Sequence, residues 1–270
     1  MPGAGICEPH VGKLLEQTPS MLAMETALKT LRTAADALGN ALLETLWPTR
    51  CAICDRPGYL ICPGCRRSLP YLDYWGACPR CGAAFGLLQC TECNPVTLGA
   101  WDRRALPLAS CTSTVRFTDK TARVVTVFKD KGERRLAGEM AALMAPTLPE
   151  SLVQQASCVT FVPATKAAFR RRGFDHTQLL AAHLARQLQL PCRNLLLRPE
   201  SADQRGLTRR ERFKNMAGAF RAQAGEDALA GACVVLADDV ITTGATLYAA
   251  ADALLEAGCA SVHGVSFARV

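Results

Sequence analysis

The sequence lacks the features that mark a membrane, secreted or disordered protein. None of its 270 residues lie in a run that approaches the roughly 18 apolar residues of a membrane-spanning helix, so no integral membrane segment is predicted. No basic stretch followed by an apolar core opens the chain, which argues against a signal peptide. Hydrophobic residues make up 49% and charged residues 20%, a globular composition that excludes a fibre. We therefore expect a globular, cytoplasmic protein.

Pattern and composition divide the chain into four segments. Residues 1–20 show no periodicity, and we expect them to be flexible. Residues 21–46 repeat leucine and alanine at steps of three and four, which predicts an amphipathic helix that ends before Pro48. Covering the protein's own core is the favoured role of this helix, with a membrane or partner face as the alternative. Residues 47–100 are rich in cysteine, and residues 101–270 alternate strand and helix patterns.

Cysteine is distributed unevenly. Eight of the 14 cysteines form four Cys-x-x-Cys pairs, Cys51/Cys54, Cys62/Cys65, Cys78/Cys81 and Cys90/Cys93. Such a pair can turn around a metal ion, and Zn²⁺ takes four thiolates in a tetrahedron. We therefore predict a zinc-binding module over 47–100 with one or two structural zinc ions. The sequence leaves open whether the first Cys-x-x-Cys pair shares a zinc ion with the second pair or with the third.

Two other uses of these thiols are less favoured. Disulfides would be reduced in the cytosol, and the usual spacings of iron–sulfur ligands are absent. The remaining cysteines are single, and four of them sit in apolar stretches, so we interpret them as small buried side chains. The single cysteines are Cys7, Cys111, Cys158, Cys192, Cys233 and Cys259.

The second half of the chain predicts a parallel sheet covered on both faces. Continuous apolar segments at 157–162, 232–237 and 261–268 read as buried strands, and 108–117 reads as extended. A helix follows Asp175, which can cap its first turn. Further helical patterns cover 120–146, with a break near Lys131-Gly132, and 245–258, which ends at Gly258.

The most informative segment follows the strand at 232–237. Asp238 and Asp239 stand at the end of this strand, and a threonine-rich loop then opens into a helix. In open α/β sheets, ligands bind at the carboxyl ends of the strands, and the N–H groups of a helix N-terminus suit phosphate. Two carboxylates suit ribose hydroxyls, directly or through Mg²⁺. The loop residues are Thr242, Thr243, Gly244, Ala245 and Thr246.

This segment resembles the phosphoribosyl pyrophosphate (PRPP) motif of type I phosphoribosyltransferases. The resemblance implies a type I phosphoribosyltransferase-like parallel sheet flanked by helices, with the small zinc module N-terminal to it. It assigns Asp238 and Asp239 to ribose and Mg²⁺, and the loop Thr242–Thr246 to the 5′-phosphate of PRPP.

A wider resemblance covers about positions 46–270. Four cysteine pairs before such a domain resemble the ComF family of competence-associated proteins, and so do Leu46-Trp47-Pro48, Arg172-Gly173-Phe174 and the pattern Gln204, Glu211, Arg212, Asn215 and Phe220. The family implies a part in DNA uptake during natural transformation, on the cytoplasmic side, with single-stranded DNA and DNA-uptake proteins as partners. The chain departs from the family at Phe161–Thr165, where Val-Pro-Val-Pro is usual. It also departs at Asp175, where Asn is usual and Asp adds negative charge beside the expected diphosphate site.

Positive charge concentrates between residues 161 and 221. Thirteen Lys and Arg face four acids there, an excess larger than the chain's net charge of +7. In the loop expected after the strand at 157–162, four cations suit pyrophosphate: Lys166, Arg170, Arg171 and Arg172. The basic stretch 204–221, with Phe213 and Phe220, suits single-stranded nucleic acid. A solvated cationic surface is the alternative for any one arginine.

Three functions therefore compete. The leading one is a PRPP-binding protein of the ComF type that transfers the phosphoribosyl group with Mg²⁺, a reaction that needs positioned charges rather than a nucleophilic side chain. The second keeps PRPP binding without catalysis, as a sensing module. The third is an accessory protein that binds single-stranded DNA. The sequence leaves the acceptor and the presence of catalysis open.

Overall fold

The computed structural model describes residues 48–197, 216, 218–223 and 229–270. Within it, residues 50–270 form one compact unit. The segments expected to be flexible (1–20) and helical (21–46) lie outside the described residues, as does most of the basic stretch 204–221.

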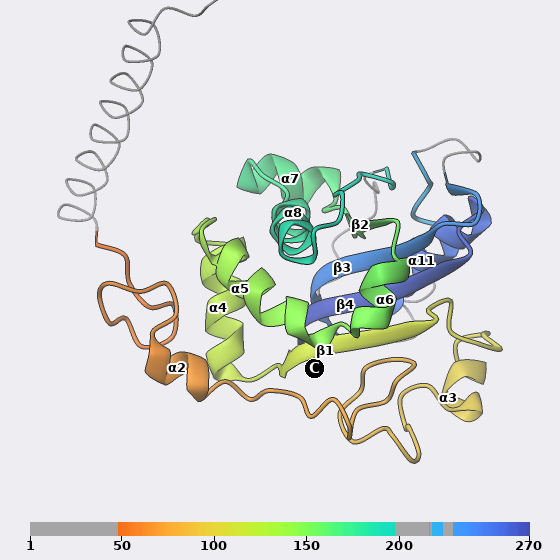
Figure 1. Cartoon of the computed structure of the whole chain (residues 1–270), viewed down its shortest axis with the longest axis horizontal. Helices are drawn as coiled ribbons and strands as arrows, with labels where there is room; N and C mark the ends of the chain where they lie inside the picture. Colours follow the sequence, from red (N-terminus) through yellow and green to blue (C-terminus); the bar gives the residue numbers. More distant parts are fainter. Residues whose placement is uncertain (1–47, 198–215, 217, 224–228) are drawn as a thin grey trace, which may run out of the picture. The chain divides into compact units, whose positions relative to one another are not determined.

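Four parallel strands form the central sheet (Figure 1), in the order β1-β4-β3-β2. The strands are β1 (Ser110–Arg116), β2 (Cys158–Phe161), β3 (Cys233–Ile241) and β4 (Ser261–Arg269). The parallel sheet is confirmed, and so are the three strands predicted from the apolar segments; the segment 108–117, predicted to be extended, holds β1. Because β3 lies between β4 and β2, the loop after it opens near the middle of the carboxyl edge of the sheet.

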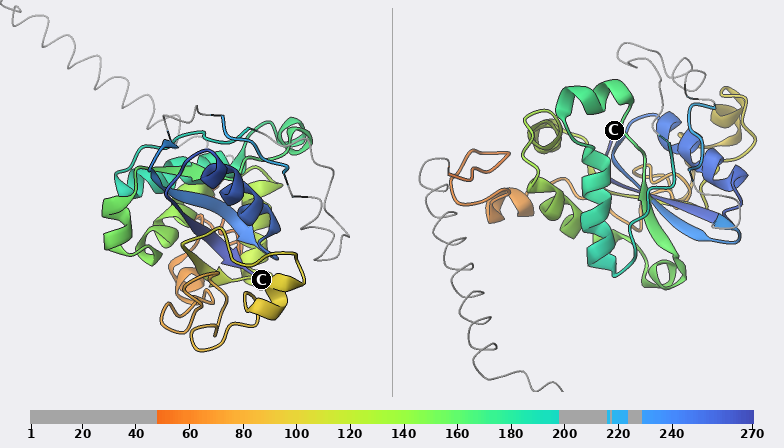
Figure 2. Two further views of the ribbon diagram at one scale, coloured as in Figure 1. Left: turned by 90° about the vertical axis from the view of Figure 1, so that its right-hand side faces the viewer. Right: turned by 90° about the horizontal axis from the view of Figure 1, so that it is seen from above.

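Helices cover both faces of this sheet, as predicted. Along β3, Val235 and Ala237 pack with α4, α5 and α8, whereas Val234 and Leu236 pack with α11 on the other face. Figure 2, seen from above, shows α8 and α11 on opposite sides of the strands. The helices are α2 (Pro63–Arg67), α3 (Pro95–Gly99), α4 (Asp119–Lys129), α5 (Leu136–Met144), α6 (Glu150–Gln155), α7 (Lys166–Arg172), α8 (His176–Leu188) and α11 (Ala245–Glu256), with a 3₁₀ turn η1 (Ala145–Thr147).

Helix ends follow local signals in the sequence. The Asp175 carboxylate accepts hydrogen bonds from the N–H groups of Thr177 and Gln178, so it caps α8 as predicted. Gly132 has a φ of +75° in the turn between α4 and α5, the break predicted near Lys131-Gly132.

The cysteine segment packs along the outer edge of the sheet. The Leu72 N–H donates to the Thr114 carbonyl (3.0 Å) and the Arg116 N–H donates to the Pro70 carbonyl (2.9 Å). These bonds surround an antiparallel bridge between Tyr71 and Val115 of β1. In Figure 1 this segment, coloured orange to yellow, runs beside β1. The exposed edge of β1 is thereby covered, while a domain boundary near residue 100 stays a prediction.

Candidate functional site

A cavity of about 550 Å³ opens where β2 and β3 end. It brings together two of the predicted acids and several of the predicted threonines and arginines. The predicted residues that line it are Asp238, Asp239, Thr242, Thr246, Arg171 and Arg172. The other predicted residues, Thr243, Gly244, Ala245, Lys166 and Arg170, are not among the residues that line it. The carboxyl edge of the sheet therefore gathers the polar groups as the sequence predicts.

The two acids lie within β3, which continues to Ile241 beyond the predicted strand end at 237, and both are buried, with 8% of Asp238 and 3% of Asp239 exposed. An Asp238 carboxylate oxygen accepts the Asp239 N–H at 2.8 Å, and an Asp239 oxygen accepts the Val240 N–H at 2.9 Å. The other Asp239 oxygen receives Lys129 Nζ at 2.9 Å and lies 3.3 Å from His176 Nε2. The backbone thus holds both carboxylates rigidly at the cavity wall.

The two acids differ in charge. Burial raises the pKa of Asp238, and the neighbouring Asp239 raises it further, to well above its usual value. Burial also acts to raise the pKa of Asp239, but Lys129 and His176 outweigh it and hold that pKa well below its usual value. The pair therefore carries its negative charge on Asp239, and a cation bound in the cavity would draw the proton from Asp238.

Lys129 and His176 are part of the site although the sequence reasoning missed them. Lys129 is the last residue of α4, and Asp239 raises its pKa against the effect of burial. His176 is the first residue of α8; its Nδ1 lies 3.5 Å from Arg172 Nη1, and its Nε2 faces Asp239. The charged run Lys129–Lys131 at a helix end was the available signal for the first. Nothing in the sequence pattern marks His176 beyond its place after Asp175.

The threonine loop enters α11 through a left-handed turn at Gly244, whose φ is +82°. A Cβ at this position would lie 2.5 Å from the Tyr248 ring, so both the backbone angle and the space require glycine. The Ala245 N–H donates to Thr243 Oγ1 at 3.3 Å. The first turn of α11 therefore faces the cavity with Thr242 and Thr246 on its wall.

The predicted pyrophosphate loop is in part a helix. Residues Lys166–Arg172 form α7, which Thr165 caps and Gly173 ends, so the expectation of a loop there is wrong. Because a helix turns its side chains in different directions, Arg171 and Arg172 line the cavity and Lys166 and Arg170 do not. Arg172 bonds Asp130 at 3.3 Å, and its Nε is buried without a hydrogen-bond partner among the described residues.

Asp175 does not add free negative charge to the cavity. Its two carboxylate oxygens accept from Ala164 N (3.0 Å), Thr177 N (3.1 Å) and Thr177 Oγ1 (2.7 Å), and it is not among the residues that line the cavity. The carboxylate instead ties the turn after β2 to the start of α8. The departure from the family's Asn thus keeps the capping role.

The eight paired cysteines form two groups of four. In each group the Sγ atoms lie within 4.8 Å of one another, and the groups are Cys51, Cys54, Cys62 and Cys65, then Cys78, Cys81, Cys90 and Cys93. The first Cys-x-x-Cys pair therefore lies with the second, and the third pair lies with the fourth. Sulfur atoms of different pairs are 3.5–3.7 Å apart. Disulfide sulfurs lie about 2.05 Å apart, and all described cysteines are free thiols.

Both groups fit zinc. Four thiolates at about 2.3 Å from a tetrahedral zinc ion are about 3.8 Å apart, close to the spacing found here. The Cys62 N–H donates to Cys51 Sγ at 3.4 Å; such backbone bonds outweigh the effect of burial and lower the pKa of Cys51 to about 7. Burial instead raises the pKa of Cys65 to about 12, so four thiolates need a cation to be charged together.

Of the single cysteines, Cys111, Cys158 and Cys259 are buried as expected. Cys233 is half-buried and Cys192 is exposed. Cys7 lies outside the described residues.

Comparison with known proteins defines the class of the site. The family model described as "Phosphoribosyl transferase domain" matches residues 178–269, which hold most of α8 and all of β3, α11 and β4. The chain thus carries a phosphoribosyltransferase-type domain, with the acid pair and threonine loop inside the matched region. No helix in the described part of the chain has the length and apolar character needed to cross a membrane.

Several relatives match a larger share of the chain than this domain does. "Competence protein ComFC" of Bacillus subtilis is 25% identical over 79% of this chain and 86% of its own length. "DNA utilization protein YhgH" of Salmonella typhimurium is 29% identical over 80% and 95%, and "Competence protein F" of Haemophilus influenzae is 24% identical over 77% and 90%. These relatives, together with the matched phosphoribosyltransferase domain, confirm the resemblance to the ComF family.

Proposed function

We propose that the cavity at the end of β3 binds PRPP together with Mg²⁺. The observation that carries this proposal is the buried acid pair on the cavity wall, with the threonine loop leading from the end of the same strand into α11. A diphosphate with a divalent cation supplies both the cation that the acids need and the phosphates that the loop and arginines suit.

The arrangement of the cavity suggests a role for each wall. Asp238 and Asp239 take the ribose hydroxyls and Mg²⁺, while Thr242–Thr246 take the 5′-phosphate at the N-terminus of α11. Arg171 and Arg172 take the pyrophosphate, and Lys129 adds a third cation on the same side. Lys166 and Arg170 have less support, because neither lines the cavity. Mg²⁺, when bound, would neutralise charge on the pyrophosphate.

A calorimetric titration with PRPP and Mg²⁺ tests the binding. We expect saturable binding to the wild type and at least a tenfold loss in Asp239→Asn, or about 1.4 kcal/mol. Asp252→Asn makes the same exchange on α11, where Asp252 pairs with Arg103 outside the cavity, and should bind PRPP like the wild type. No binding to the wild type would refute the proposal.

A measurement of turnover distinguishes a phosphoribosyltransferase from a protein that only senses PRPP. We favour transfer, in which the cations hold the departing pyrophosphate and no nucleophilic side chain is needed. Pyrophosphate release, measured with PRPP and Mg²⁺ across nucleobases and amines, would support it. Binding without release from any acceptor would favour a PRPP-sensing module.

The names of the relatives suggest the process that this site serves. Because those proteins are named for competence and DNA utilization, we propose a role for this chain in DNA uptake. Exposed aromatic side chains on the second cysteine group favour a contact with single-stranded DNA as a second candidate function. Trp75 is 78% and Phe85 is 82% exposed, and Tyr74 packs edge-on against Trp75. Such rings can stack on bases.

Binding of a labelled single-stranded oligonucleotide tests this second function. We expect the affinity to fall as salt rises, because Lys and Arg contact the phosphates. Trp75→Ala should weaken binding by about 1 kcal/mol or more. Equal affinity of Trp75→Ala and the wild type, or an affinity that does not change with salt, would remove this function from the segment.

A further inference from the structure

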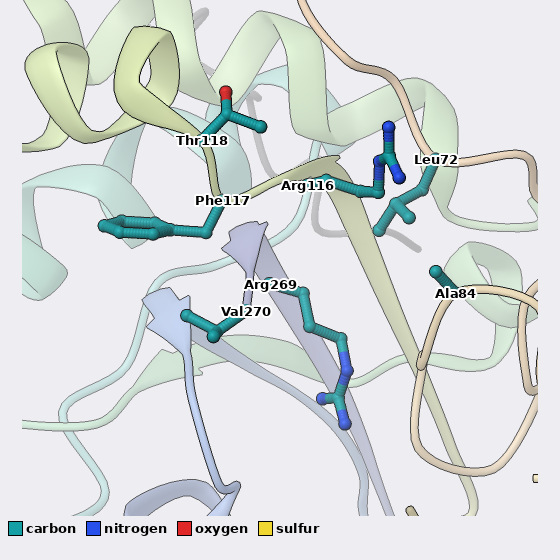
Figure 3. A pocket seen from close by; sticks show the side chains of 7 residues that line it. All are labelled: Leu72, Ala84, Arg116, Phe117, Thr118, Arg269 and Val270. Carbon is teal, nitrogen blue, oxygen red and sulfur yellow. The ribbon is translucent and has the colours of Figure 1, made fainter. Parts of the chain in front are cut away.

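A second cavity lies beside the first, at the carboxyl ends of β1 and β4. It measures about 240 Å³. β1 and the turn after it supply Arg116, Phe117 and Thr118, β4 supplies Arg269, and the cysteine segment supplies Leu72 and Ala84 (Figure 3). Because Phe117 lines both cavities, a ligand in one can lie next to a ligand in the other.

The second cavity holds a buried cation with an unused donor. Only 4% of Arg269 is exposed, and its Nη1 is buried with no hydrogen-bond partner among the described residues. A buried charged donor without a partner is costly, which makes it a marker for a missing ligand atom. In Figure 3 the Arg269 side chain extends from β4 toward the loop that carries Ala84.

A second arginine adds to the positive charge. Arg116 is the direct register partner of Arg269 on the neighbouring strand, and the two side chains extend from there in different directions (Figure 3). None of the residues that line the cavity has an acidic side chain. The cavity therefore favours an anion, and a guanidinium pairs best with a flat carboxylate or with a phosphate.

The shape of the lining distinguishes between these two anions. Leu72, Phe117 and Val270 supply apolar walls, which suit a ring rather than a hydrated phosphate. We propose that this second cavity binds the carboxylate of a small aromatic or heterocyclic acid, with the acid group at Arg269 and the ring against Phe117. Nothing about the first cavity is needed for this binding.

The position of the cavity also suggests a role as the acceptor subsite, a step that rests on the proposed function. An acceptor held at Arg269 would direct a ring or amine nitrogen past Phe117 toward ribose C1 of PRPP. The C1–O bond breaks with its electron pair leaving on pyrophosphate, the nitrogen lone pair forms the C1–N bond, and an N–H proton of an amine passes to solvent. A ring nitrogen without hydrogen would retain the positive charge.

Benzoate and benzamide form a matched pair of probes, because they share a ring and size but differ in charge. We expect ligand-observed NMR to show benzoate binding to the zinc-loaded protein and benzamide binding at least tenfold more weakly. Arg269→Gln should reduce benzoate affinity at least tenfold, and Arg269→Lys should retain part of it. Equal binding of the two probes, or benzoate binding that Arg269→Gln leaves unchanged, would overturn the proposal.

Two controls keep this test decisive. Zinc content and thermal unfolding report whether Arg269→Gln folds, since Arg269 lies near the Cys81 thiol. If it does not fold, the exposed Arg116→Gln, expected to weaken benzoate several-fold, and a wild-type crystal soaked with benzoate decide the outcome. Benzoate density away from Arg269 counts against the proposal. PRPP binding is measured separately: benzoate without PRPP binding would refute the proposed function alone, and PRPP without benzoate would refute this subsite alone.

Discussion

The cysteine segment and the cavity at the end of β3 hold their reactive groups together in opposite ways. Eight thiols converge from loops and from α2, a helix of only five residues, and burial raises the pKa of one of them, Cys65, to about 12. Asp238 and Asp239 instead lie near the carboxyl end of a nine-residue strand that pairs on both sides within a buried sheet. We therefore expect the first region to need a metal ion to fold, whereas the second is formed by the sheet before any ligand binds.

Because of this difference, we expect the two regions to have different roles, one in ligand binding and one in structure. A site that the sheet forms in advance can bind and release a small ligand without unfolding. The cysteine segment covers the edge of β1 and supplies walls to the second cavity, so we expect a structural metal ion there to stay bound. Substitutions in the first region should therefore change stability, and substitutions at the acids should change binding.

The largest expected effect comes from breaking one metal group. Cys81 is fully buried in the second group, and Cys81→Ser should lower the zinc content from two ions to one per chain. Structural zinc binding is worth about 10 kcal/mol or more in small domains, so limited proteolysis should cut the loops around this group. Elemental analysis provides the count, with exposed Cys192→Ser as the control. Two zinc ions retained in Cys81→Ser would show that this thiol is not a ligand.

Two glycines with left-handed backbones allow a matched test of the threonine loop. Gly173 has a φ of +73° with open space around its missing Cβ, so Gly173→Ala should cost about 1 kcal/mol. Gly244→Ala adds a clash with the Tyr248 ring and should cost about 2 to 4 kcal/mol. Chemical denaturation measures both. Similar losses in the two variants would mean that the ring moves aside freely.

Loss of the cation beside Asp239 should have an intermediate effect. Lys129→Met leaves a buried carboxylate with one fewer partner, which should cost about 2 to 3 kcal/mol. Lys129→Arg keeps the charge and should lose less. Denaturation at neutral pH compares the two variants, and a neutral effect of Lys129→Met would contradict the ion pair described here.

The smallest change in stability should come from Asp238→Asn, which should stabilise the fold at neutral pH rather than destabilise it. A raised pKa in the folded state means that this group stabilises the fold fully below the unfolded value near 3.8, and that the contribution is lost as pH rises through the folded pKa. Asp238→Asn avoids that loss, so it should be about 1 kcal/mol more stable than the wild type at pH 7.5 and about equal near pH 4. Thermal unfolding across this range tests the trend, and a variant less stable at pH 7.5 would contradict the raised pKa.

Sequence patterns predicted the parts of the molecule that depend on local chemistry. Apolar runs located the strands, Asp175 located the start of α8, and the acid–threonine motif located the cavity. Patterns could not place α7, because Lys166–Arg172 carries no apolar periodicity and its helix depends on the cap at Thr165 and the turn at Gly173.

The remaining site residues meet only through the fold. Lys129 and Asp239 are far apart in sequence, and α4 brings them into contact across the end of the sheet. Arg116 and Arg269 become neighbours because β1 and β4 pair. Strand order is a property of the packed molecule, so a linear pattern does not contain it.

A crystal structure of the zinc-loaded protein with PRPP and Mg²⁺ tests the central claim most directly. We predict the 5′-phosphate at Thr242–Thr246, the ribose and Mg²⁺ at Asp238 and Asp239, and the pyrophosphate beside Arg171 and Arg172. The second cavity should remain open next to ribose C1. PRPP bound elsewhere, or bound with its 5′-phosphate away from the N-terminus of α11, would contradict the account.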